Sequence, residues 1–183
     1  VAADLLSQAE HDKMASAVLV TDSRELAQAV SREIENQLQT LEREEIARAS
    51  IEQNGKIIVA RSLTQAAAVA NRIAPEHLEL SVDDPFDYLG LIENAGSIFL
   101  GRYNPEPMGD YFAGPNHTLP TMGTARFYSP LSVDDFIKKS QFSYYTRKAL
   151  EKDYRKVSRF AKEEGLTAHA RAVDIRFEKE GET

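Results

Sequence analysis

Four histidines are the side chains best suited to chemistry, and each has a carboxylate nearby in the sequence. Imidazole and carboxylate groups bind metal ions, and histidine exchanges protons near neutral pH. None of the four lies within an apolar stripe that would mark it as a core residue. They are His11, His77, His117 and His169, with Glu10, Glu76, Asp110 and Glu164 as their acidic neighbours in that order.

The most specific arrangement is Pro75-Glu76-His77-Leu78, where a helix is expected to give way to a strand. Proline restricts the backbone as the chain enters that strand. A histidine at this junction could act as a general base, and the neighbouring glutamate could activate a water molecule. The alternative is a surface glutamate beside a half-buried histidine without a chemical role.

Residues 109–121, GDYFAGPNHTLPT, contain two glycines and two prolines and follow neither a helical nor a strand period. We predict a loop over this stretch, which carries Asp110 and His117. A strand-like segment at residues 97–101 precedes it. Functional groups often lie on loops at the ends of a sheet, although a plain connection has the same composition.

Gln8 and His11 form a further candidate pair near the start of the chain. Residues 2–11 are typical of a helix, on which two side chains three positions apart share one face. An amide oxygen and an imidazole placed in this way can share a metal ion. A solvated polar face is the alternative for an isolated pair of this kind.

The composition narrows the class of protein. The 183 residues include no cysteine, which excludes disulfides, thiolate zinc sites and cysteine nucleophiles. Hydrophobic residues make up 42%, too many for a disordered chain, and the net charge of −7 argues against a nucleic-acid surface. With no apolar run near membrane-spanning length and no signal-peptide pattern, we expect a soluble, cytoplasmic protein. Since the first residue is Val1, we also expect the chain to be part of a longer protein.

Apolar runs predict strands at residues 17–21, 56–60, 77–82 and 97–100. Helices are predicted between them, at residues 22–38, 43–53, 62–73 and 85–94. Asp22 with Glu25, and Ser62 with Gln65, have the spacing of capping boxes. The core stripe of the first helix is expected at Leu26, Val30, Ile34 and Leu38. Strands that alternate with helices indicate an α/β fold with a parallel sheet.

The pattern changes after Gly123, where helices are predicted at residues 131–139 and 147–164, and a shorter helix or a strand at residues 167–177. We therefore expect two domains, an α/β domain at residues 1–131 and a helical arm at residues 132–183. An arm of this length buries little apolar surface by itself. It should pack on the body of the protein or on a partner chain.

Five segments together resemble the C-terminal half of the histidinol dehydrogenase family. They are SQAEHD at 7–12, APEHLEL at 74–80, NAGSIFLG at 94–101, GDYFAGPNHTLPTMGTARF at 109–127 and EGLTAHARAV at 164–173. The resemblance implies a partial Rossmann-like parallel sheet with helices on both faces, followed by a helical dimerisation arm. It also implies a homodimer in which this arm is swapped between subunits.

The same resemblance implies an activity and residue roles. The family oxidises L-histidinol to L-histidine through L-histidinaldehyde, with zinc and NAD as cofactors. Gln8, His11 and Asp110 would bind zinc, together with His169 from the second subunit. These four residues, with His77 and Glu164, would contact substrate. His77 would be the general base, Glu76 would activate water, and His117 would support the site.

The chain has no GxGxxG or GxxxxGKS/T motif, so no nucleotide-phosphate loop is visible. The resemblance places most NAD contacts in the N-terminal half of the family, outside this sequence, so this chain alone would be incomplete. A dimerising α/β interaction module without activity is one alternative. A zinc hydrolase that uses Glu76 is another, although the chain lacks an HExxH pair.

Overall fold

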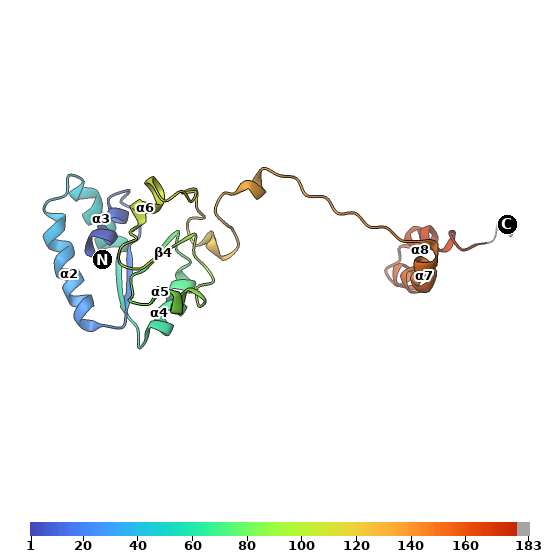
Figure 1. Cartoon of the computed structure of the whole chain (residues 1–183), viewed down its shortest axis with the longest axis horizontal. Coiled ribbons are helices and arrows are strands. Elements are labelled where there is room, and N and C mark those ends of the chain that lie inside the picture. Colours follow the sequence, from blue (N-terminus) through green and yellow to red (C-terminus); the bar gives the residue numbers. More distant parts are fainter. Residues whose placement is uncertain (179–183) are drawn as a thin grey trace. The chain divides into compact units, whose positions relative to one another are not determined.

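A computed structural model describes residues 1–178 and divides the chain into two compact units, Val1–Ile137 and a second unit that begins at Lys138 (Figure 1). Each unit is considered separately below. The division lies slightly later than the boundary between residues 131 and 132 that the sequence suggested.

The first unit contains four short strands, each near its predicted position. β1 (Val18–Thr21) pairs in parallel with β2 (Lys56–Val59), and β3 (His77–Leu80) pairs in parallel with β4 (Ser97–Leu100). The α/β class is therefore confirmed. The strands form two separate two-stranded sheets in the described residues, not one continuous sheet. A four-residue strand offers few ladder hydrogen bonds, and helical crossovers separate the strands of successive pairs.

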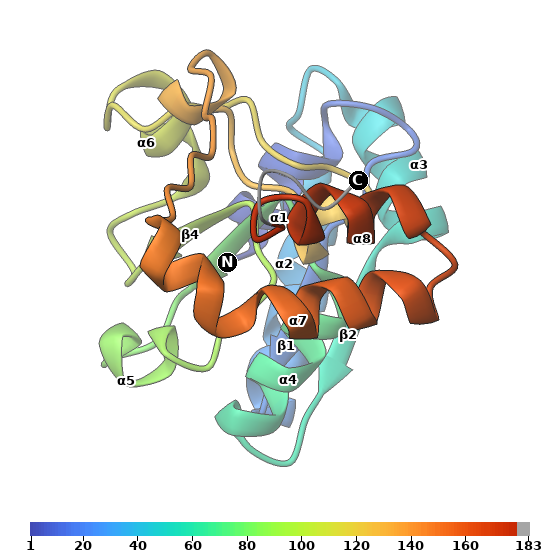
Figure 2. The ribbon, with the colours of Figure 1, turned by 90° about the vertical axis from the view of Figure 1, so that its right-hand side faces the viewer.

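Helices cover both faces of the β1–β2 pair. α2 (Arg24–Leu38) packs on one face, and α4 (Leu63–Ile73) packs on the other (Figures 1 and 2). The main apolar cluster joins α2 to α1 (Ala2–Ala9) and α3 (Glu44–Asn54). Its buried members are Ala2, Leu6, Ala9, Val30, Ile34, Leu38 and Ala47.

α2 differs from its prediction in two details. Its N-cap is Ser23, whose Oγ accepts a hydrogen bond from the Leu26 backbone N–H at 3.1 Å, and not Asp22. The buried stripe begins at Ala27, whereas Leu26 is 40% exposed. A strict four-residue spacing drifts around a helix by about 40° per step, so a stripe traced back from Leu38 leaves the core before it reaches Leu26.

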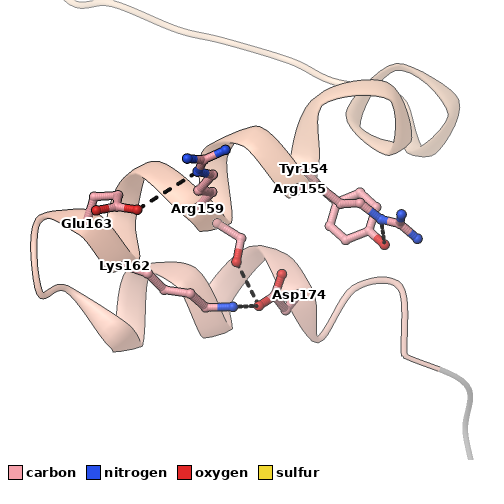
Figure 3. Close-up of a pocket in the computed structure, with 7 residues that line it drawn as sticks. Tyr154, Arg155, Arg159, Lys162, Glu163 and Asp174 are labelled. Atoms are coloured by element: carbon pink, nitrogen blue, oxygen red, sulfur yellow. Dashed lines mark hydrogen bonds and ion pairs between the residues drawn. The ribbon is translucent and has the colours of Figure 1, made fainter.

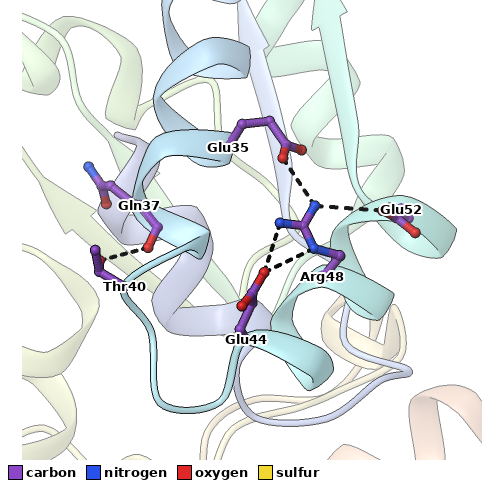
Figure 4. A network of polar contacts seen from close by, with 6 residues as sticks. All are labelled: Glu35, Gln37, Thr40, Glu44, Arg48 and Glu52. Atoms are coloured by element: carbon purple, nitrogen blue, oxygen red, sulfur yellow. Dashed lines mark hydrogen bonds and ion pairs between the residues drawn. The ribbon is translucent and has the colours of Figure 1, made fainter.

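A network of charged residues also joins α2 to α3. The guanidinium of Arg48 lies 3.0 Å from Glu35 on α2 and 3.0 Å from Glu44 on α3, with Glu52 at 3.8 Å (Figure 4). These groups are partly exposed, so water screens their attraction. The apolar cluster between the helices is therefore the main source of their packing energy.

α4 begins as predicted at Ser62, whose Oγ accepts from the Gln65 backbone N–H at 3.2 Å. The next helix, α5 (Pro85–Leu89), is shorter than the predicted 85–94. The Asn71 side chain binds the backbone of the residues that follow α5. Its Nδ2 donates to the Leu91 carbonyl and its Oδ1 accepts from the Glu93 N–H, both at 2.7 Å. These bonds replace those that a longer helix would have made.

The predicted loop at residues 109–121 is wrong at its start. Gly109, Asp110 and Tyr111 belong to α6 (Glu106–Tyr111), which begins after Pro105. The helix lies close against β4, since a Cβ on Gly109 would stand 2.5 Å from Phe99 Cε1. Glycine is thus required here by close packing. The remainder of the loop has no regular structure before the short 3-10 turn η1 (Thr124–Arg126).

The second unit is built on α7 (Arg147–Glu163) and α8 (Thr167–Asp174). Asp174 joins the two helices, because Oδ2 accepts from Ser158 Oγ at 2.8 Å and lies 3.2 Å from Lys162 Nζ (Figure 3). Tyr154 stacks on Phe177 with ring centres 4.2 Å apart. Few residues of this unit are buried, and Phe142, Tyr144, Tyr145 and Phe160 are exposed.

The predicted helix at residues 131–139 is wrong. One 3-10 turn, η2 (Val133–Asp135), forms in its place and is capped by Ser132. Val133, Phe136 and Ile137 are all exposed, so no packed surface supports a longer helix. No helix within residues 1–178 is both long and apolar enough to span a membrane.

Candidate functional site

His77 is the first residue of β3, at a junction fixed by backbone hydrogen bonds. Ala74 has a left-handed conformation (φ 53°) that ends α4. The carbonyls of Pro75 and Glu76 then accept from the N–H groups of Gly96 and Ser97, at 2.9 and 2.8 Å. The start of β4 thus fixes the backbone of the Pro-Glu-His motif. The His77 ring lies beside Phe99, with ring centres 6.0 Å apart.

Two carboxylates from α6 converge on His77. Glu106 and Asp110 are one helical turn apart, and together with His77 they offer ligand atoms that all lie within 4.8 Å of one another. His77 Nε2 is 3.9 Å from Glu106 Oε1, and the two side chains are 17% and 13% exposed. The Glu106 backbone N–H donates to Glu79 Oε1 on β3 at 3.0 Å. This bond ties the start of α6 to the strand that carries His77.

The electrostatic environment of this cluster is strongly acidic. Burial, a hydrogen bond with Asp110 and repulsion from Asp110, Glu79 and Glu76 raise the pKa of Glu106 to about 7. Burial also raises the pKa of Glu79, although the hydrogen bond from the Glu106 backbone opposes this shift. A bound cation would relieve the repulsion between these carboxylates.

The donor atoms of this cluster are suitable ligands for such a cation. Imidazole nitrogen and carboxylate oxygen are both zinc ligands, and the cluster provides one imidazole and two carboxylates. Asp110, a predicted metal ligand, and His77, a predicted base, therefore lie together. Glu76 is half-buried, and its charge acts on Glu106, so the predicted water-activating residue also lies nearby.

Gln8 and His11 do not lie on one face of a single helix, as the sequence predicted. Gln8 is half-buried on α1, but α1 ends at Ala9 and His11 lies beyond it, exposed, in a turn. Asp12 explains this ending, because its Oδ1 accepts from the Met14 N–H at 2.8 Å and stabilises a turn in place of the helix. His11 does not belong to the cluster of His77, Glu106 and Asp110. Its role as a zinc ligand stays a prediction.

The remaining candidates lie on exposed surfaces. His117 is exposed beside Asn116, whose Nδ2 donates to the Leu131 carbonyl at 2.7 Å. Glu164 ends α7 and His169 lies on α8, both exposed in the second unit. The predicted contacts of Glu164 with substrate and of His169 with zinc stay predictions, as does the supporting role of His117.

Sequence reasoning missed Glu106 and Glu79. Glu106 is four residues before Asp110, a spacing that puts two side chains on one face of a helix, but the composition around Asp110 is typical of a loop. Glu79 is two residues after His77, a spacing that puts both side chains on one face of a strand. In both cases the spacing in the sequence was sufficient to identify the residue as a neighbour of a predicted site residue.

The fold and the cluster together define a class: an α/β protein with a histidine–carboxylate site where a helix meets the start of parallel strands. Comparison with known proteins makes this specific. A family model described as histidinol dehydrogenase matches residues 1–177. This chain belongs to the histidinol dehydrogenase family.

Individual relatives agree with this assignment. The chain is 58% identical to histidinol dehydrogenase from Bacillus cereus over 180 residues, which is 98% of this chain and 42% of that protein. It is also 58% identical to the protein from Geobacter metallireducens over 182 residues. The crystal structure of histidinol dehydrogenase from Elizabethkingia anophelis matches with a TM-score of 0.86 and 42% identity, covering 96% of this chain and 40% of that one. The chain thus spans about two-fifths of the length of these relatives.

Proposed function

We propose that this chain supplies the metal- and substrate-binding part of a histidinol dehydrogenase. The complete protein would oxidise L-histidinol to L-histidine through L-histidinaldehyde, with NAD as the oxidant. The observation that carries the proposal is the family match over residues 1–177. The cluster of His77, Glu106 and Asp110 adds a site of suitable chemistry within those residues.

In the first oxidation, His77 would take the hydroxyl proton of the alcohol while a hydride leaves the same carbon for NAD. Its position at a rigid junction suits a base whose ring must be aligned with the substrate. The product is the aldehyde, and the histidine must release its proton before the next step.

In the second oxidation, Glu76 would take a proton from water as the water oxygen bonds to the aldehyde carbon. The hydrated aldehyde would then lose a hydride to a second NAD and a proton to the site, which yields the carboxylate of histidine. Glu76 and His77 are adjacent, so the two groups can act on the same carbon in turn.

Zinc would be held by Gln8, His11 and Asp110, with His169 from a second copy. When bound, it would orient the imidazole and amino groups of the substrate by accepting their nitrogen lone pairs. The acidic surroundings of Asp110 support a cation here. Glu164 would contact the substrate, and His117 would support the site from the loop that follows α6.

The arm would complete the site as part of a homodimer. Its described residues, 132–178, expose five aromatic side chains and bury little surface, which supports a partner chain as the packing surface of the arm. Most contacts to NAD would come from the N-terminal portion found in the relatives. A cytoplasmic location, as expected from the sequence, would suit the activity.

Reconstitution tests the proposal. This chain would be joined to the N-terminal portion of the Bacillus cereus relative, and NADH formation would be followed with and without L-histidinol. We expect histidinol-dependent formation of about two NADH per substrate, because an alcohol becomes an acid in two oxidations. A stable dimer that binds zinc but forms no NADH would favour the interaction module instead.

A further inference from the structure

One nitrogen of His77 has no partner. Nε2 is the buried side-chain nitrogen or oxygen atom without a hydrogen-bond partner in residues 1–178. Nδ1 of the same ring also makes no hydrogen bond there, but it is not enclosed in this way. The two ring nitrogens therefore differ: Nε2 is enclosed by the protein, whereas Nδ1 is not.

Glu106 is the group that Nε2 faces. Its Oε1 is 3.9 Å away, the one carboxylate oxygen within ion-pair distance of the ring in the described residues. This separation is too long for a hydrogen bond, but a small side-chain rotation would close it. An unpaired buried N–H costs free energy, so the closed arrangement is favoured.

The carboxylate is itself well fixed. The Glu106 backbone N–H donates to Glu79 Oε1 at 3.0 Å, and the Glu106 side chain is 13% exposed. Glu106 thus lies on the same helix as Asp110, with its Oε1 3.9 Å from Nε2 of His77 on β3.

We propose that Glu106 is a positioning residue for His77: its carboxylate holds a proton on Nε2 and leaves Nδ1 free to accept a proton from a ligand. A histidine acts as a base through one nitrogen only when the other carries the proton. The tautomer with the proton on Nε2 follows from the geometry of this chain alone. The role of this tautomer in catalysis rests on the proposed function.

The first test is nuclear magnetic resonance of this chain with ¹⁵N-labelled histidine. There are only four histidines, and His77→Asn identifies the signals of interest. We expect a proton on Nε2 that exchanges slowly with water. In Glu106→Ala this exchange should become at least about tenfold faster, because the acceptor oxygen next to Nε2 is removed.

Two variants serve as controls. Glu106→Gln keeps the shape and an acceptor oxygen, so it should retain most of the slow exchange and shows whether loss of folding explains the alanine result. Asp87→Asn, an exposed carboxylate on α5, should leave the His77 signals unchanged. A proton on Nδ1 in the unaltered chain, or unchanged exchange in Glu106→Ala, would overturn the proposal.

Zinc addition separates positioning from metal binding. If Nε2 loses its proton and its resonance shifts as Zn²⁺ binds, Nε2 is a metal ligand and the positioning role is wrong. If zinc binds while the Nε2 proton persists, the proposal holds.

Kinetics of the reconstituted protein provide the link to function. We expect Glu106→Ala to lower kcat by about ten- to hundredfold with KM changed less than about threefold, and Glu106→Gln to recover part of kcat. An inactive wild-type protein would count against the proposed function, while the resonance experiment still decides the role of Glu106.

Discussion

At the scale of single residues, the surroundings of His77 come from residues distant in the sequence. Its neighbour in the chain is Glu76, but its ring lies beside Phe99 on β4 and near Glu106 on α6. Family motifs predicted His77, Glu76 and Asp110 from the sequence. These motifs could not predict that Glu106 and Glu79 also lie close to His77, because that depends on how α6 packs against β3.

The two adjacent residues should affect different steps. His77→Asn should lower the oxidation of L-histidinol by about 10²- to 10⁴-fold, since the general base is removed. Glu76→Gln should slow oxidation of the aldehyde by a similar factor and leave alcohol oxidation within about threefold of wild type. Single-turnover measurement of NADH from each substrate checks this separation, and an equal loss of both steps in Glu76→Gln would contradict it.

The raised pKa of Glu106 predicts a dependence of stability on pH. The unfolded carboxyl loses its proton near 4.5, whereas the folded one keeps it to about 7. This group therefore stabilises the fold at low pH, and that contribution is lost as the pH rises from 4.5 to about 7. Glu106→Gln, which resembles the protonated form, lacks this loss.

Urea unfolding of the metal-free chain across that window would measure the effect. We expect wild type to lose stability relative to Glu106→Gln as the pH rises. A constant difference between the two proteins would show that the environment of Glu106 does not favour its protonated form.

At the scale of elements, the apolar runs located all four strands, and the polar and apolar spacing located α4 and α7. The failures have local causes. Asp12 and Asn71 form side-chain bonds to the backbone that end helical stretches early. The predicted helix at 131–139 lacked a packing partner, and α6 was hidden by its glycine and prolines, which are usual in loops.

Close packing of α6 on β4 depends on Gly109. Gly109→Ala would place a Cβ 2.5 Å from Phe99 Cε1, so α6 must move and take Glu106 and Asp110 away from His77. We expect a loss of about 1–3 kcal/mol in the free energy of unfolding, together with weaker zinc binding.

Gly90→Ala provides the matched control, because Gly90 has ordinary helical angles and an added Cβ would meet no atom within 4 Å. Its stability should stay within about 0.5 kcal/mol of wild type. Denaturant unfolding of both variants checks the contrast, and equal stabilities would refute the close-packing argument.

At the scale of the whole molecule, the two units carry different parts of the predicted site. Asp110 lies in the first unit and His169 in the second, and the second unit has a small core with exposed aromatic side chains. The sequence predicted an α/β body followed by an arm. It could not show by itself which surface the arm packs against, since that depends on contacts between residues far apart in the sequence.

Complementation between two inactive variants measures the central claim most directly. Asp110→Asn and His169→Ala would each be made in the reconstituted protein, and then co-expressed. Each variant alone should be inactive. Random pairing should restore about a quarter of wild-type activity, since about half of the dimers are mixed and each mixed dimer has one intact site of two. Histidinol-dependent NADH formation at that level is the result we predict, whereas no recovery in mixed dimers would contradict a site shared between two copies.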